Sequence, residues 1–338
     1  MDAVLFIASL VLIFFGSTLF TNGVEWVGRK FDLSESVVGS VLAAVGTALP
    51  ETVIPVIAIF LTGGTSGRDV GIGAILGAPF MLGTLAMFIT GLSVFLFRNR
   101  RETGANLNAS SQMRRRDLGF FLFAYLSAIG ISFIPHTEVK AFIAPLFVAI
   151  YIVYVWRVLK TDSGSSSEAL DPLTLDVWIA RLRNVNTSQS PSEWIVVGQT
   201  GLSLACIVVG AQLFVNQIIS LAELLHANAT ILALMIAPIA TELPEKLNSV
   251  LWVRQGKDGL ALGNITGAMV FQSCIPVSFG VAFTTWALQP IPLASALLAV
   301  VAGLWVYFLS LKNRLTASSL FFNGMLYLAF LLVVLRFA

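Results

Sequence analysis

Charged side chains are scarce in this sequence. Asp, Glu, Lys and Arg make up 11% of its 338 residues, and hydrophobic residues make up 57%. Soluble domains carry about 25% charged residues. This composition excludes an ordinary soluble fold and predicts a protein embedded in a lipid bilayer. The near balance of 20 basic and 18 acidic residues also argues against a nucleic-acid partner.

Cysteine and the motifs of common enzymes are also rare or missing. The two cysteines, Cys206 and Cys274, lie in apolar runs without a CxxC pattern, which excludes a disulfide framework and a thiolate metal site. The sequence contains no HExxH, no GxSxG and no aspartate well inside a predicted span, so an intramembrane enzyme is not predicted. No cofactor is expected.

Apolar runs of membrane-spanning length dominate what is present. They lie at 3–21, 36–62, 70–97, 118–134, 139–159, 194–218, 228–253, 259–286, 289–311 and 315–336. The first run follows Asp2 rather than a basic segment, so we interpret it as a retained helix and not a signal peptide. The sequence therefore predicts an all-α polytopic membrane protein with ten transmembrane helices. Residues 1–160 would form one five-helix half, 161–193 a cytoplasmic linker, and 194–338 the second half.

Basic residues in the predicted loops give the orientation. When the loops alternate across the membrane, one side collects Arg29, Lys30, Arg98, Arg100, Arg101, Arg114, Arg115, Arg116, Arg157, Lys160, Arg181, Arg183, Arg254, Lys257, Lys312 and Arg314. The other side collects only Arg68, Lys140 and Arg336. Because positive loops stay in the cytoplasm, both termini are predicted outside a plasma or inner membrane.

Two stretches of the chain resemble each other. Leu33–Phe60 reads LSESVVGSVLAAVGTALPETVIPVIAIF and Leu225–Trp252 reads LHANATILALMIAPIATELPEKLNSVLW, with Thr-x-Leu-Pro-Glu in common. Each is followed by a Gly-x-x-x-Gly, at Gly73–Gly77 and Gly263–Gly267, which is typical of close helix packing. Since five predicted helices separate equivalent positions, the two halves are predicted to be inverted repeats. Such repeats carry transport sites near the bilayer midplane.

The shared motif brings oxygen atoms to one point of each half. Pro50 and Pro244 are predicted to interrupt their helices and to free a backbone carbonyl one turn earlier. A threonine and a glutamate four residues apart lie on one helix face; these residues are Thr47, Glu51, Thr241 and Glu245. Carbonyl, hydroxyl and carboxylate oxygens are the ligands of hard cations. The motif therefore predicts a cation site between the halves.

Charge at this site favours exchange over simple binding. A carboxylate in the membrane costs at least ~2.5 kcal/mol, and two facing carboxylates repel each other unless a cation or protons neutralise them. Glu242 and Asn264 are further predicted ligands. Glu242 could instead pair with Lys246, Asn264 could bond across helices, and Glu51 and Glu245 could be buried structural acids.

These motifs resemble those of the sodium/calcium exchangers within the cation/calcium antiporter superfamily, whose repeats carry Gly-Thr-Ser-Leu-Pro-Glu and Gly-Asn-x-x-Gly-Ser-Asn. The resemblance implies an ion site enclosed by the second, third, seventh and eighth helices, with the first and sixth sliding across them. It assigns Glu51 and Glu245 as central calcium ligands, with Thr47 and Thr241 adding oxygen. The chain departs from the pattern where Ala78-Pro79 and Ala268-Met269 replace Ser-Asn, and Ala48 and Glu242 replace serine.

The function predicted from these residues is secondary antiport. Calcium would be exchanged for sodium or protons by alternating access, with inorganic cations and the lipid bilayer as the only partners indicated. The departures from the family pattern leave open a proton- or potassium-coupled exchanger of another cation, or a non-transporting or channel-like member. The sequence does not indicate the oligomeric state.

Overall fold

Every regular element that can be described in this protein is a helix. The computed structural model describes residues 2–30, 43–161, 171–183 and 191–337, except for the side chains of 43–48, 161, 183, 243–248 and 337. The α-helices are α1 (Ala3–Lys30), α3 (Ala43–Ile57), α4 (Gly64–Met81), α5 (Met87–Phe97), α6 (Ser111–Ser132), α7 (Thr137–Thr161), α8 (Thr174–Arg183), α9 (Glu193–Leu225), α10 (Ala229–Arg254), α11 (Asp258–Phe283), α12 (Pro290–Leu311) and α13 (Phe321–Phe337). Two π-helices, η2 (Ala58–Thr62) and η3 (Leu82–Ala86), and two 3₁₀ turns, η4 (Arg98–Arg100) and η5 (Ser318–Leu320), complete them.

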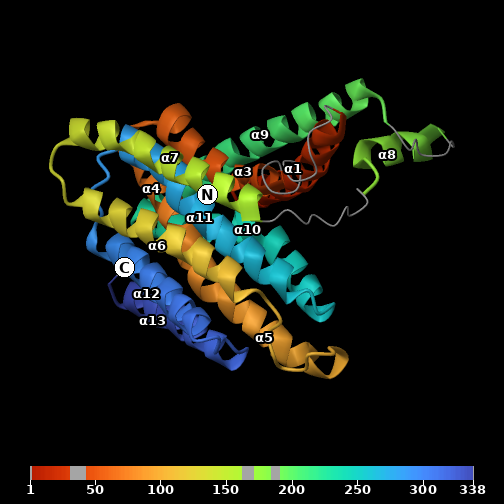
Figure 1. Ribbon diagram of the computed structural model, residues 1–338. Coiled ribbons are helices and arrows are strands. Elements are labelled where there is room, and N and C mark those ends of the chain that lie inside the picture. The colour runs from red at the N-terminus through yellow and green to blue at the C-terminus, as the bar shows by residue number, and fades with distance from the viewer. Residues whose placement is uncertain (1, 31–42, 162–170, 184–190, 338) are drawn as a thin grey trace.

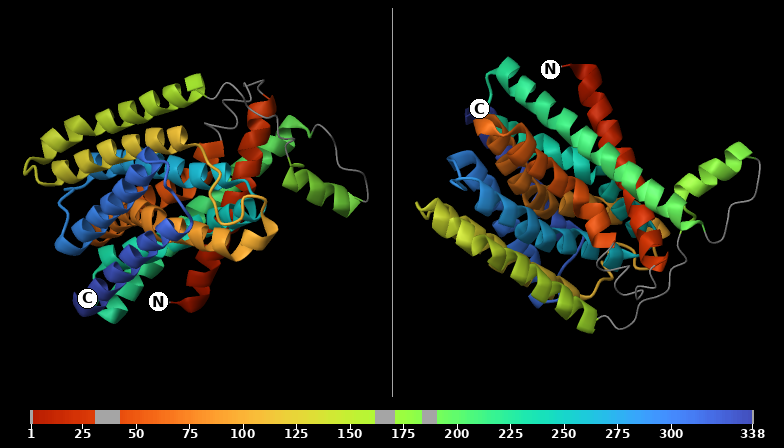
Figure 2. Two further views of the ribbon diagram at one scale, coloured as in Figure 1. Left: turned by 60° about the horizontal axis from the view of Figure 1, so that its bottom comes forward. Right: turned by 90° about the horizontal axis from the view of Figure 1, so that it is seen from above.

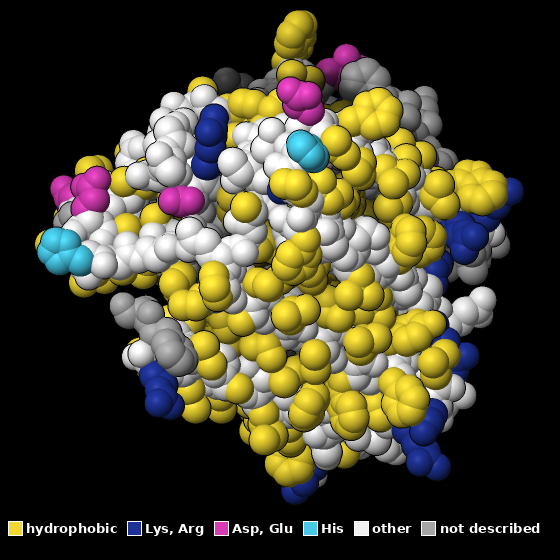
Figure 3. All heavy atoms as spheres, turned by 90° about the vertical axis from the view of Figure 1, so that its left-hand side faces the viewer, with side chains coloured by type: hydrophobic (Ala, Val, Ile, Leu, Met, Phe, Trp, Pro, Cys, Tyr) yellow, Lys and Arg dark blue, Asp and Glu magenta, His cyan; other side chains and the backbone are white. Residues whose placement is uncertain are grey.

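Seven helices of the described part are long and apolar enough to cross a membrane. They are Ala3–Lys30, Gly64–Arg100, Thr137–Lys160, Glu193–Leu225, Asp258–Phe283, Pro290–Leu311 and Ser318–Arg336. Two shorter apolar helices, Leu49–Thr62 and Ala229–Glu242, lie in the two copies of the repeat. Hydrophobic side chains are spread over the lower and right parts of the face in Figure 3, and most of the charged ones lie toward its edges. An all-helical, multi-pass membrane protein is therefore confirmed, and the count of ten spans stays a prediction.

Most of the helices form three groups that lie side by side. Helices α1 and α9 pack along one flank, and α6, α7, α12 and α13 lie on the other (Figures 1 and 2). Between them lie α3, α4, α10 and α11. The predicted repeats therefore supply the centre of the molecule.

Small residues hold α1 and α9 together. A Cβ placed on Gly16 would lie 3.1 Å from the backbone nitrogen of Ile207, and one on Gly210 would lie 3.1 Å from that of Ile13. Glycine allows the two backbones to approach this closely, which is how membrane helices gain van der Waals contact. The two helices therefore form a tightly packed pair.

The predicted prolines do not end the central helices. Helix α3 continues through Pro50 and Pro55, and α10 continues through Pro238 and Pro244. A helix can absorb a proline by a kink or a π-turn, at the loss of one backbone hydrogen bond. The expected interruptions are thus missing hydrogen bonds within continuous helices, and the π-helix η2 follows shortly after Pro55.

A fully buried ion pair joins the loop after η4 to the start of α11. Arg101 donates from Nη1 to Asp258 Oδ1 at 2.7 Å and from Nη2 to Asp258 Oδ2 at 2.6 Å, and both side chains are inaccessible to solvent. Arg101 Nη1 also donates to the carbonyl of Val253 at 2.6 Å, and the amide of Asn108 donates to Asp258 at 2.8 Å. The pair therefore fixes this loop to the connection between α10 and α11.

Asp258→Asn should destabilise the protein by about 3–5 kcal/mol, because it leaves the Arg101 guanidinium buried without its counter-charge. The double variant Arg101→Leu with Asp258→Leu should lose less, since no charge is then buried alone. Thermal unfolding in detergent measures both, with Glu102→Gln at an exposed neighbouring position as control. Equal unfolding temperatures for Asp258→Asn and the control would contradict this role.

Candidate functional site

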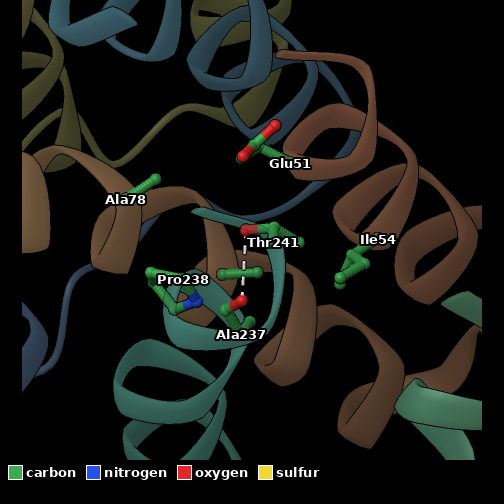
Figure 4. A pocket seen from close by; sticks show the side chains of 7 residues that line it. Glu51, Ile54, Ala78, Ala237, Pro238 and Thr241 are labelled. Atoms are coloured by element: carbon green, nitrogen blue, oxygen red, sulfur yellow. Dashed lines mark hydrogen bonds between the residues drawn. The ribbon is translucent and has the colours of Figure 1, made fainter. Parts of the chain in front are cut away.

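A small cavity lies where α3, α4 and α10 meet. Its lining consists of Glu51, Ile54, Ala74, Ala78, Ala237, Pro238 and Thr241. The centre of a water molecule could move within a volume of about 10 Å³ there, which is close to the least that one water molecule needs. Glu51 and Thr241 face this space from opposite repeats (Figure 4). The cavity therefore has room for a single water or a dehydrated ion.

Glu51 contributes a carboxylate to the cavity from α3. Its side chain is 6% exposed, inside a segment of strongly apolar neighbours. Pro55 lacks the N–H that would otherwise donate to the backbone carbonyl of Glu51, so this residue brings two kinds of oxygen to the same turn. Both the carboxylate and such a carbonyl are ligands that calcium and sodium accept.

Thr241 adds a hydroxyl from α10. Its side chain is 4% exposed, and its Oγ1 donates to the carbonyl of Ala237 at 3.2 Å, as drawn in Figure 4. A hydroxyl that donates one hydrogen bond keeps its lone pairs. The oxygen of Thr241 can therefore coordinate a cation without breaking this bond.

The α4 wall of the cavity is apolar. Ala74 and Ala78 present only methyl groups to the space. Each alanine follows a glycine. Gly73 lies against the backbone carbonyl of Thr230 in α10, and Gly77 lies against that of Leu234. The carbonyl of Leu234 is the one that Pro238 cannot donate to. Gly73 and Gly77 therefore let α4 close the cavity against α10, in agreement with the packing role predicted for them.

The equivalent glycines of the second half have a different environment. A Cβ on Gly263 would lie 3.1 Å from the end of the Met113 side chain, and one on Gly267 would lie 3.6 Å from the hydroxyl of Tyr154. These glycines face α6 and α7, where a side chain can be accommodated. The two Gly-x-x-x-Gly motifs are thus alike in sequence but not in their contacts.

Of the other predicted ligands, those whose side chains are described are not among the residues that line the cavity. Glu242 is 1% exposed on α10, next to Thr241, but it does not line the cavity. Asn264 is half-buried on α11 and does not line it either. Thr47 lies in α3 and Glu245 in α10, and their side chains lie outside the described residues, as does that of Lys246. The structure therefore brings together Glu51 and Thr241 of the predicted set.

Asp117 is a buried carboxylate outside this cavity that the sequence did not predict. Asp117 of α6 is 2% exposed and accepts a hydrogen bond from Thr266 of α11 at 2.7 Å and one from Tyr154 of α7 at 3.2 Å. Arg116 lies 3.1 Å from the same carboxylate. Asp117 directly precedes a predicted span and follows three arginines, so its sequence context resembles a solvated loop. Its only signal was its position at the start of an apolar run.

Several known proteins are similar to this chain in sequence or in fold. The chain is 25% identical over 266 residues to the putative antiporter CaxA of Alkalimonas amylolytica, covering 78% of this chain and 75% of the relative. It is 24% identical over 280 residues to the sodium/calcium exchanger MaX1 of Methanosarcina acetivorans, covering 77% of each. The crystal structure of the H⁺/Ca²⁺ exchanger CAX matches with a TM-score of 0.72 and 18% identity, covering 97% of this chain and 81% of that one.

Most of the chain also matches one protein family. The match to the family described as sodium/calcium exchanger protein covers residues 1–160 and 195–338. It therefore includes both copies of the repeat and every residue of the cavity. On this evidence the chain belongs to the sodium/calcium exchanger protein family.

Proposed function

We propose that this protein is a secondary antiporter that exchanges calcium, or a related cation, for sodium or protons. The observation that carries the proposal is the buried carboxylate of Glu51, which faces the hydroxyl of Thr241 across a cavity with room for one ion. One relative is named a putative antiporter and another a sodium/calcium exchanger, which supports the same class of transport.

Electrostatics gives the reason for exchange. An ionised carboxylate enclosed by Ile54, Ala74, Ala78 and Ala237 has lost most of its hydration. Such a charge is costly in a low-dielectric environment unless a cation or a proton accompanies it. When one cation leaves, another must enter before the site can be carried across the membrane. The site therefore couples the movement of two ions.

The full ligand set that we propose includes residues from both halves. Calcium takes six to eight oxygens at about 2.3–2.6 Å, and the described cavity supplies one carboxylate and one hydroxyl. We assign Glu245 and Thr47 as the counterparts of Glu51 and Thr241, with Glu242 and Asn264 as outer contributors. Backbone carbonyls next to the prolines would complete the shell.

The architecture that we propose has ten spans in two inverted halves. Residues 1–160 and 194–338 would form the halves, and 161–193 would be a cytoplasmic linker. The basic loops favour an orientation in which both termini lie outside the cell membrane. In this arrangement α3 and α10 are equivalent helices of opposite direction, so that each half supplies one side of the ion site.

The number of oxygens in the cavity bears on the choice of counter-ion. The α4 wall offers only the methyl groups of Ala74 and Ala78, so few neutral ligands face Glu51 in the described cavity. Several sodium ions need several sets of oxygens, whereas protons need only carboxylates. Proton exchange therefore fits the described cavity at least as well as sodium exchange does.

Gradient-driven uptake tests the proposal. Purified protein in proteoliposomes should accumulate radiolabelled calcium when an outward sodium gradient or an outward proton gradient is imposed, and the more effective gradient identifies the counter-ion. Liposomes without protein give the background. Uptake that is equally fast without either gradient would instead indicate a channel, and binding without uptake would indicate a sensor.

A further inference from the structure

Helix α8 stands apart from the transmembrane groups. It occupies Thr174–Arg183, inside the segment predicted as a plain polar linker. It projects away from the bundle beside the ends of α1 and α9 and runs across the direction of α9 (Figures 1 and 2). The last turn of α1, at this same end, carries Arg29 and Lys30.

Side chains of the transmembrane helices hold the start of α8. The amide of Thr174 donates to Asn22 Oδ1 of α1 at 3.0 Å, and the amide of Leu175 donates to Gln199 Oε1 of α9 at 2.7 Å. Gln199 is 2% exposed and also donates to Asn22 at 3.0 Å. These bonds satisfy amides at the helix N-terminus that have no partner within α8. The orientation of α8 is thus fixed by α1 and α9.

The outward face of α8 is apolar. Its large apolar residues recur with helical spacing at Leu175, Trp178, Ile179 and Leu182. Trp178 is 46% exposed and Leu182 is 87% exposed, whereas Asp176 and Ala180 on the other side are buried. A soluble helix would turn such a stripe toward the protein. In α8 it turns away from the described part of the molecule.

Aromatic residues mark the depth at which α8 begins. Trp194, in the first turn of α9, is 86% exposed and precedes Gln199 by five residues, about 8 Å along the helix. At the end of α7, Lys160 lies 3.9 Å from the ring centroid of Trp156, which is 54% exposed. Exposed tryptophans beside basic residues are typical of the boundary between lipid headgroups and acyl chains. The start of α8 is bonded to Gln199, about one and a half turns of α9 from Trp194.

We propose that α8 lies in the plane of the membrane surface and binds anionic phospholipids. Trp178 and Leu182 would enter the boundary between headgroups and acyl chains, and the exposed Arg181 would contact the phosphates. Helices of this kind combine apolar burial with attraction to negative lipids. The proposal rests on the membrane placement given under the proposed function. It makes α8 an anchor that ties the α1–α9 pair to the membrane surface.

Fluorescence quenching tests the position of α8 without measuring transport. Leu182→Cys, in a Cys206→Ala background, would be labelled with a bimane dye, since the remaining Cys274 is fully buried. The protein is placed in nanodiscs of phosphatidylcholine with or without phosphatidylglycerol. A lipid carrying a quencher near the headgroup should quench this label several-fold more than a label at Glu102→Cys in the exposed loop. Aqueous iodide should instead quench the label at Glu102→Cys more than the label at Leu182→Cys.

The charge of Arg181 supplies the second comparison. Arg181→Gln should weaken the affinity of α8 for the anionic surface about fivefold, which would appear as weaker headgroup quenching of the label at Leu182→Cys in the anionic discs. It should have little effect in the neutral discs. Strong quenching of Leu182→Cys by iodide would overturn the proposal, because α8 would then lie in water. Protection from both quenchers would also overturn it, because protein, such as a second copy of the chain, would cover the stripe. Either result leaves the proposed antiport untouched.

Discussion

Glu51→Gln should abolish exchange. The substitution keeps the size of the side chain and removes the one charge that the described cavity directs at its ion. Removing one partner of a buried charge pair costs about 3 kcal/mol or more, which is over 100-fold in affinity. We expect calcium uptake by proteoliposomes to fall to the level of empty liposomes, and calcium-induced protection against thermal unfolding to disappear.

The same variant separates function from folding. Without ions, Glu51→Gln buries an amide instead of a carboxylate, so its unfolding temperature should be equal to or above that of the parent. Glu223→Gln removes the same charge at an exposed position of α9 and should transport like the parent. If Glu51→Gln still bound and exchanged calcium like Glu223→Gln, the assignment of the ion site would be wrong.

Gly77→Ala should impair the protein strongly, whereas its repeat equivalent Gly267→Ala should not. A Cβ on Gly77 would overlap the carbonyl oxygen of Leu234 and lie 2.7 Å from Cγ of Pro238. These backbone and ring atoms cannot move aside, so α4 must separate from α10, at a cost of about 1–3 kcal/mol. Because both helices line the cavity, we also expect exchange to fall at least tenfold.

The control lies in the second copy of the motif. A Cβ on Gly267 would make an ordinary contact with Tyr154, at 3.6 Å, and alanine favours a helix over glycine by about 0.5–1 kcal/mol. Gly267→Ala should therefore keep its unfolding temperature and its transport rate. Thermal unfolding and calcium uptake of the two variants, measured together, decide the matter. Similar losses in both would show that the motif acts symmetrically and that α4 has no special contact with α10.

The helical membrane fold was predictable from the sequence because a bilayer restricts the backbone to few structures. Backbone groups in a bilayer must bond within their own helix, so apolar length reveals a span. Apolar length is a poor guide where charged residues lie inside a membrane-spanning helix. Helix α6 carries Arg114, Arg115 and Arg116 near its start, and it is not among the seven helices that are long and apolar enough to cross a membrane. Helix α8 was missed because its outward apolar stripe is short and lies within a polar segment.

The candidate site was partly predictable for a similar reason. A glutamate after Leu-Pro in an apolar run identified Glu51, and the repeat identified Thr241 through its counterpart. The contacts of α4 and α11 could not be derived, since two Gly-x-x-x-Gly motifs read alike yet face different helices. The hydrogen bonds of Asp117 were also hidden, because they join residues of three helices that are distant in the sequence.

The most direct test of obligatory exchange at Glu51 is a calcium flux with no partner ion. Proteoliposomes would be loaded with radiolabelled calcium and diluted into buffer free of calcium and sodium, with the membrane potential clamped and the pH equal and alkaline on both sides. We predict that the parent protein retains its calcium and releases it once sodium or acid is added outside. Two results would contradict obligatory exchange at Glu51. One is calcium release at the same rate before sodium or acid is added, and the other is release from Glu51→Gln in response to sodium or acid.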